Sequence, residues 1–168
     1  MSSKIIIIAL RFVILLLFQV LVFDYINLFG YLNPCVYLIF IYLYPVQNNR
    51  LLFLFVSFLL GLFIDMISGT GGVHAAASVF AAYSRPVVLK FSFGVLYENQ
   101  TVKFSNVDRR AMFIYITILT VFHHAILYAL DAFNLSLIFT ILKQILFAGI
   151  FTIILNFLFI TLLSRKKG

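Results

Sequence analysis

Long apolar stretches separated by short polar ones constrain this chain more than any other feature of its sequence. Residues 5–23 are interrupted only by Arg11 and Gln19, and comparable runs occupy residues 51–67, 111–130 and 136–163. A helix needs about 20 apolar residues to cross roughly 30 Å of hydrocarbon. The chain is 64% hydrophobic and only 10% charged, which is not the composition of a soluble domain. The sequence therefore predicts an all-α integral membrane protein.

We expect one transmembrane domain over residues 1–168, built as a bundle of about six transmembrane helices. The approximate spans are residues 5–23, 34–46, 51–67, 72–85, 111–130 and 136–163. The second is expected to stop near Pro45 and the fourth at Arg85-Pro86, because proline interrupts the hydrogen bonding of a helix. Residues 86–110 are polar and basic in their second half and are expected to form a cytoplasmic or interfacial loop.

The first apolar run has a rival interpretation as a secretory signal, because Lys4 precedes it. Arg11 splits the apolar core that a signal would need, and no cleavage site of small residues follows the run. We therefore expect a retained span.

Lysine and arginine are distributed on one side of the predicted bundle. With the N-terminus inside and six crossings, ten basic residues lie on the inner side: Lys4, Arg50, Arg85, Lys90, Lys103, Arg109, Arg110, Arg165, Lys166 and Lys167. Such a bias indicates the cytoplasmic side. We expect the chain to cross the plasma (inner) membrane several times, with both termini in the cytoplasm. The net charge of +7 then indicates contact with anionic membrane lipids and not with nucleic acid.

Small residues follow one face of the third span and of the segment that returns after it. On the third span the face consists of Ser57, Gly61, Asp65, Ser68 and Gly72, and on the return it consists of His74, Ser78, Ala81 and Arg85. Small residues at helical spacing let two membrane helices approach closely. The glycines at 69, 71 and 72 are expected to reverse the chain, so that residues 61–86 form a tight hairpin.

Polar residues inside the spans predict a cluster in the outer half of the bundle. Its candidate members are Asp65, His74, His123, His124 and Lys143, with Asp65 paired to Lys143 or to a histidine. An ionised carboxylate in a span costs roughly 2.5–3.5 kcal/mol or more, so it needs a partner or a proton. The cluster is either a satisfied network that sets helix packing or a site that binds a ligand.

No pattern of catalytic residues accompanies this cluster. There is no G-x-S-x-G turn, no H-E-x-x-H helix and no second aspartate in a span to form a pair with Asp65. His123 and His124 are adjacent and point about 100° apart on a helix, which is a poor geometry for one metal ion. The single cysteine, Cys35, excludes an internal disulfide. We expect neither an enzyme nor a metal or cofactor site.

The hairpin residues resemble the signature of the rod shape-determining protein MreD family. The resemblance consists of Gly61, Leu62, Asp65, Ser68, Gly69, Gly72, His74 and Ala75, followed by Ala82, Tyr83, Arg85 and Pro86. The small size, the six-span hydropathy and the paired histidines of the fifth span extend it to most of the chain. Gly71 departs from the family, which often has leucine there.

The resemblance implies a fold similar to the substrate-binding subunits of energy-coupling-factor transporters. It also implies a non-enzymatic component of the bacterial elongation machinery, which regulates cell shape and lateral peptidoglycan synthesis. The implied partners are MreC, MreB, RodA and a class B penicillin-binding protein. Gly61, Leu62, Asp65, Ser68, Gly69, Gly72, His74, Ala75, Arg85 and Pro86 are then a structural and interaction hairpin. The alternative, from the polar cluster, is a transporter subunit that binds a small molecule or a lipid.

Overall fold

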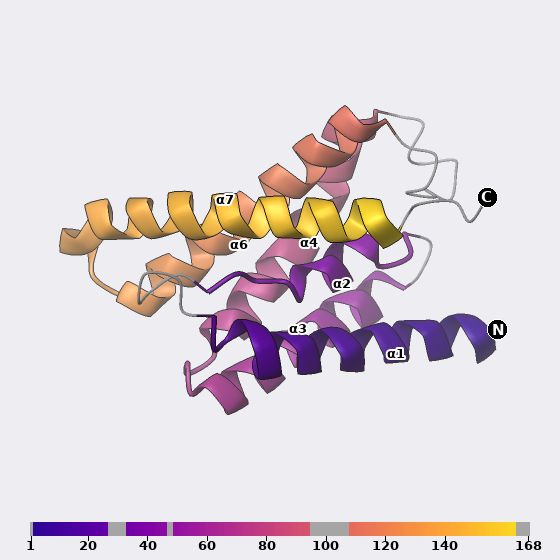
Figure 1. Ribbon diagram of the computed structural model, residues 1–168, viewed down its shortest axis with the longest axis horizontal. Coiled ribbons are helices and arrows are strands. Elements are labelled where there is room, and N and C mark those ends of the chain that lie inside the picture. Colours follow the sequence, from indigo (N-terminus) through magenta and orange to yellow (C-terminus); the bar gives the residue numbers. More distant parts are fainter. Residues whose placement is uncertain (1, 27–32, 47–48, 95–107, 164–168) are drawn as a thin grey trace.

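The computed structural model describes residues 2–26, 33–46, 49–94 and 108–163, and all the regular structure in these ranges is helical. In chain order the elements are α1 (Ser2–Phe18), the π-helical turn η1 (Gln19–Phe23), α2 (Leu38–Leu43), α3 (Arg50–Ser68), α4 (Val73–Phe93), α6 (Arg109–Ala132), the 3-10 turn η3 (Leu135–Leu137) and α7 (Ile138–Leu163) (Figure 1). The expected all-α class is confirmed for this part of the chain.

Within these ranges, four helical segments are long and apolar enough to cross a membrane. They are Ile5–Phe23, Arg50–Ser68, Arg109–Ala132 and Ile138–Leu162. Many of their large apolar side chains point outward, as lipid-facing residues do, and α1 is the most exposed of the four. By length and composition the chain is a membrane protein, as predicted. Six crossings remain a prediction.

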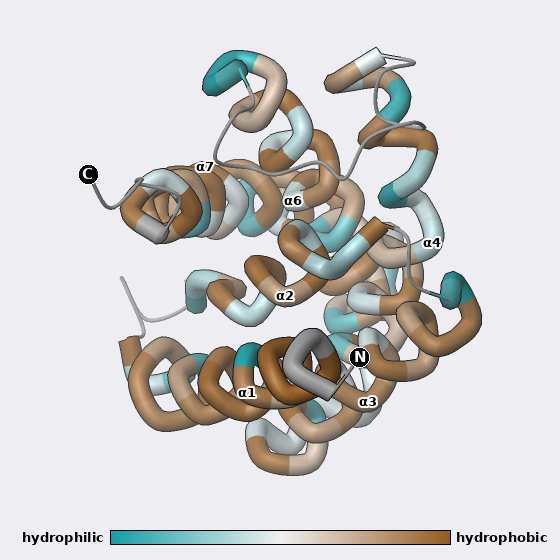
Figure 2. The backbone as a smooth tube through the Cα atoms, turned by 90° about the vertical axis from the view of Figure 1, so that its right-hand side faces the viewer, coloured by the Kyte–Doolittle hydropathy of each residue, from teal (hydrophilic) through white to brown (hydrophobic). Residues whose placement is uncertain are grey.

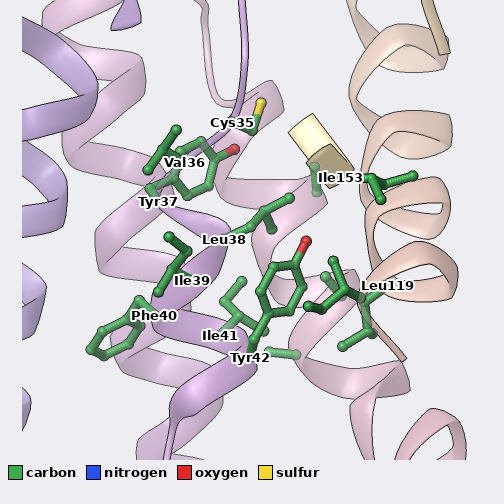
Figure 3. Close-up of a cluster of buried hydrophobic side chains, with 14 of the residues drawn as sticks. Cys35, Val36, Tyr37, Leu38, Ile39, Phe40, Ile41, Tyr42, Leu119 and Ile153 are labelled. Carbon is green, nitrogen blue, oxygen red and sulfur yellow. The ribbon is translucent and has the colours of Figure 1, made fainter. Parts of the chain in front are cut away.

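The short helix α2 lies near the middle of the molecule, with α1, α3, α4, α6 and α7 around it (Figure 2). The side chains from Cys35 to Tyr42 are all at most 4% exposed. Figure 3 shows this stretch in a cluster of buried hydrophobic side chains that includes Leu119 of α6 and Ile153 of α7. The second predicted span is thus the centre of the core, but it is a regular helix only over Leu38–Leu43 and not over residues 34–46.

Helix α4 does not end at Pro86. It continues to Phe93, so the predicted end of the fourth span and the predicted start of the loop are wrong over residues 86–93. Proline removes one backbone hydrogen bond, yet Ala81, Ala82, Val88 and Leu89 on both sides of it are buried against neighbouring helices. Tertiary packing therefore outweighs the local signal. Residues 95–107 of the predicted loop lie outside the described residues.

Candidate functional site

The turn between α3 and α4 is made by glycines in conformations that other residues rarely adopt. Gly69, Gly71 and Gly72 have φ of 70°, 67° and 98°. Glycine has no Cβ and enters this left-handed region without strain. Gly69 ends α3 by donating its N–H to the carbonyl of Asp65 at 2.8 Å. The chain reverses here as the sequence predicted.

Below the turn, the backbones of α3 and α4 touch at Gly61. A Cβ atom placed on Gly61 would lie 2.5 Å from Ala75 Cα and 2.5 Å from the carbonyl oxygen of His74. Ser57 and Ser78, one turn further along each helix, are fully buried. The small-residue contact expected of the hairpin is therefore present, although Ser68 is exposed and its hydroxyl donates to Asp24 instead.

The carboxylate of Asp65 caps the N-terminus of α4 across the turn. One oxygen accepts the backbone N–H of His74 at 3.0 Å, and the other accepts that of Ala75 at 2.8 Å. The hydroxyl of Thr70 donates to the first oxygen as well. The first N–H groups of a helix have no partner inside it, and the helix dipole favours a negative charge there. Asp65 is 4% exposed, and this cap explains how it is buried.

The partners of Asp65 correct the expected pairing with Lys143, and the expected histidine partner, His74, contacts the carboxylate through its backbone N–H and not through its ring. The carboxylate accepts from the Thr70 hydroxyl and from two backbone N–H groups, one of which belongs to His74. The side chain of Lys143 is exposed on the surface of α7. The physical reason is that the start of α4 already offers Asp65 both hydrogen-bond donors and a favourable dipole, so no cation is needed to bury it.

The histidine next to this cap reaches the core through a tyrosine. The hydroxyl of Tyr37 lies 2.9 Å from Nδ1 of His74 and 2.7 Å from Nε2 of His123. Tyr37 and His123 are fully buried, and Figure 3 shows Tyr37 on the stretch of chain that leads into α2. Tyr37 therefore joins α4 to α6 through the centre of the bundle. Sequence reasoning missed it, because a tyrosine in an apolar segment has no distinctive spacing.

His124 is also fully buried but belongs to a different set of hydrogen bonds. Its Nδ1 lies 3.0 Å from the carbonyl oxygen of Thr120, and its Nε2 lies 3.3 Å from the hydroxyl of Thr152 on α7. The same hydroxyl accepts the backbone N–H of Cys35 at 3.1 Å. The two adjacent histidines thus hold different neighbours of α6.

The stretch from Pro34 to Tyr37 is buried without being a regular helix, so its backbone groups need partners from elsewhere. Gln19 supplies most of them. Its side-chain oxygen accepts the N–H groups of Val36 at 2.8 Å and Tyr37 at 3.3 Å, and its nitrogen donates to the carbonyl of Pro34 at 3.1 Å. Asn156 of α7 donates to the carbonyl of Cys35 at 3.1 Å. The polar residues that interrupt the first and last spans therefore hold the unwound start of α2.

Arg85 performs the same task at the other end of α2. Its Nη2 donates to the carbonyls of Tyr42 at 3.1 Å and Tyr44 at 2.6 Å, and its Nε donates to the hydroxyl of Tyr115 at 2.8 Å. The guanidinium carbon also lies 5.2 Å from the centre of the Phe53 ring. The last carbonyls of a helix favour a cation, so this buried arginine is held by backbone and tyrosine oxygens.

A cavity of about 420 Å³ opens at the end of the bundle where α3 turns into α4. Polar residues from several parts of the chain contribute to its wall, namely Gln19, Asp24, Thr70, His74, Asp131 and Gln144. Of the described residues in this wall, none is a lysine or an arginine. The cavity therefore has an acidic character, and a ligand with hydrogen-bond donors or positive charge suits Asp24 and Asp131.

The residues of the predicted polar cluster have separate positions around this cavity. His74 lines it, Asp65 lies behind it as the cap of α4, and His123 and His124 lie in the core.

Two further residues of the predicted hairpin are half-buried, Leu62 on α3 and Pro86 inside α4. Within the part of the chain that the structure describes, no group of three His, Cys, Asp or Glu residues is placed to hold a metal ion.

Comparison with known proteins does not place the chain in a family. No protein-family model, no curated protein and no solved structure matches it. The family resemblance therefore depends on the hairpin residues themselves.

Proposed function

We propose that this chain is a non-enzymatic membrane component of a bacterial elongation complex, similar to the MreD family. The observation that carries the proposal is the α3–α4 hairpin. Gly61 permits backbone contact, Asp65 caps α4 through His74 and Ala75, and Gly69 makes the turn. The residues of the resemblance thus have architectural tasks, which supports an interaction protein more than a catalyst.

In this proposal the chain crosses the bacterial plasma membrane six times, with α2 and α4 as crossings and both termini in the cytoplasm. The fold is then similar to the substrate-binding subunits of energy-coupling-factor transporters. Apolar faces such as that of α1 contact lipid or partner helices, because α1 buries few of its side chains. The partners are those of the family, MreC, MreB, RodA and a class B penicillin-binding protein.

Depletion and pull-down test this function directly. Loss of the protein from a rod-shaped host should give rounded or swollen cells, and expression of the intact chain should restore rods. Crosslinking in native membranes, followed by pull-down, should recover the elongation partners. Unchanged cell shape together with the absence of these partners would contradict the proposal.

A second candidate, a transporter subunit that binds a small molecule or a lipid, is favoured by the cavity. Its wall contains the unwound residues Asn33 and Cys35 beside Asp131 and His74. In membrane transporters, such interrupted helices often form binding sites. Asp131→Asn removes one negative charge from the wall, and Asp131 is exposed, so the fold should be unaffected. A ligand that co-purifies with the protein and is lost in Asp131→Asn would favour this function over the first.

A further inference from the structure

The hydroxyl of Tyr37 has one hydrogen and lies between two ring nitrogens, Nδ1 of His74 and Nε2 of His123, at 2.9 and 2.7 Å. A hydroxyl in this position satisfies both nitrogens when it donates to one and accepts from the other. If Tyr37 donates to His74, then His123 must carry its proton on Nε2. If Tyr37 donates to His123, then His74 must carry a proton on Nδ1. The protonation of one ring therefore determines that of the other.

The other nitrogen of His123 selects between these arrangements. His123 is fully buried and its Nδ1 has no hydrogen-bond partner among the described residues. An unpaired N–H in the interior is rarer than an unpaired acceptor, and a charged ring without a partner costs still more. The Nε2–H form is also the more stable neutral form of free histidine. His123 accordingly has a bare Nδ1, and its Nε2–H donates to Tyr37.

This arrangement determines what His74 offers to the cavity. Because Tyr37 accepts from His123, its own hydrogen is donated to Nδ1 of His74, and the proton of His74 lies on Nε2. His74 lines the cavity, and among the described residues its Nε2 has no hydrogen-bond partner. We infer that His123, acting through Tyr37, makes His74 a hydrogen-bond donor to the cavity, so that a bound ligand places an acceptor atom against His74.

The position next to His74, which suits an acceptor atom of the ligand, complements the acidic wall. Asp24 and Asp131 accept hydrogen bonds, whereas His74 donates one, so the cavity suits a group with a donor or positive charge on one side and an acceptor on the other. This inference rests on the cavity as a binding site, which is the second candidate function. It does not depend on whether the chain belongs to an elongation complex.

Histidine protonation is measurable here because the chain has only three histidines. We would label the full chain with ¹⁵N-histidine in lipid nanodiscs near neutral pH, without added ligand. Each ring is assigned from the resonances that disappear when that histidine alone is substituted. His74 and His123 should both be protonated at Nε2. His124 should be protonated at Nδ1, because that nitrogen faces the carbonyl of Thr120, which only accepts. His124 thus serves as an internal control.

Tyr37→Phe tests whether the tyrosine transmits the effect. It should shift the Nδ1 resonance of His74 and the Nε2 resonance of His123, whereas Tyr42→Phe, whose hydroxyl bonds Thr120, should shift neither. A His74 ring protonated at Nδ1, alone or at both nitrogens, would overturn the inference. So would the same His74 and His123 resonances in Tyr37→Phe as in the parent chain. Neither result would bear on whether the cavity binds a ligand.

Discussion

At the scale of single residues, the buried charges of this protein are held by backbone groups. Asp65 accepts the first N–H groups of α4, and Arg85 donates to the last carbonyls of α2. Each charge lies at the helix end where the dipole favours it. A carboxylate inside a membrane span is usually interpreted as functional, yet this one is accounted for by its role as a cap.

Substitution of Asp65 tests that role. Asp65→Asn keeps one acceptor oxygen but loses the charge, so it should lower stability by about 1–2 kcal/mol. Asp65→Leu leaves the N–H groups of both His74 and Ala75 unpaired, at roughly 1–3 kcal/mol each, and should be clearly worse. Thermal unfolding in detergent measures both. Equal losses in the two variants would mean that the charge itself is needed.

At the scale of elements, α3 and α4 form one unit whose separation is set by Gly61. Ala75 and the carbonyl of His74 leave no room for a methyl group there. Gly149 on α7 is the opposite case, because a Cβ added to it would meet nothing within 4 Å. Both glycines lie inside helices, so they differ in what surrounds them and not in backbone conformation.

The two glycines therefore make a matched pair. Gly61→Ala should push the hairpin apart and lower the unfolding temperature, and in the proposed host it should fail to restore rod shape. Gly149→Ala adds the same methyl group without a clash and should be neutral or slightly stabilising, because alanine is the better helix former. Thermal unfolding and complementation are the measurements. A Gly61→Ala protein as stable and active as Gly149→Ala would show that the backbones do not need to touch.

The unwound start of α2 depends on a glutamine from another element. Gln19→Leu leaves the N–H group of Tyr37 without its partner, and the N–H of Val36 and the carbonyl of Pro34 keep only their 3.2 Å hydrogen bond to each other, so we expect a loss of about 1–3 kcal/mol. Hydrogen exchange at the N–H groups of Val36 and Tyr37 should accelerate as well. Gln144→Leu is the control, because it makes the same substitution at a half-buried glutamine of the same cavity wall. Similar effects of the two substitutions would contradict the role given to Gln19.

At the scale of the whole molecule, the cavity and the basic helix start lie at opposite ends of α6. Asp131 in the cavity wall is close to the end of this helix, and Arg109 is its first residue. In the proposed orientation the cavity faces outward and Arg109 faces the cytoplasm.

Labelling with a membrane-impermeant maleimide tests this orientation. The Asp131→Cys variant should react in intact cells, whereas the Arg109→Cys variant should react only after lysis. The native Cys35 is 2% exposed and should give little background, which the unmodified chain would control. The reverse pattern would show the opposite orientation in the membrane. Reaction of both variants in intact cells would show that α6 does not cross the membrane.

Much of this architecture is local information and can be predicted along the chain. Apolar runs of sufficient length predict the helices that can cross a membrane, and small residues spaced by three or four predict the contact at Gly61. The three glycines predict the reversal, since only glycine enters the left-handed region without strain. These features depend on a few neighbouring residues, so no knowledge of distant contacts is needed.

Other features depend on residues that are far apart in the chain and meet only when it folds. Pro86 predicts the end of a helix, yet packing on both sides carries α4 on to Phe93. Gln19 and Asn156 interrupt the first and last spans, and their shared task at the start of α2 becomes apparent only when both lie beside it. Tyr37 joins His74 to His123, and Lys143 lies apart from them on the surface. The sequence alone determines that a polar residue in a span needs a partner, but the identity of that partner follows from the packing of the helices in three dimensions.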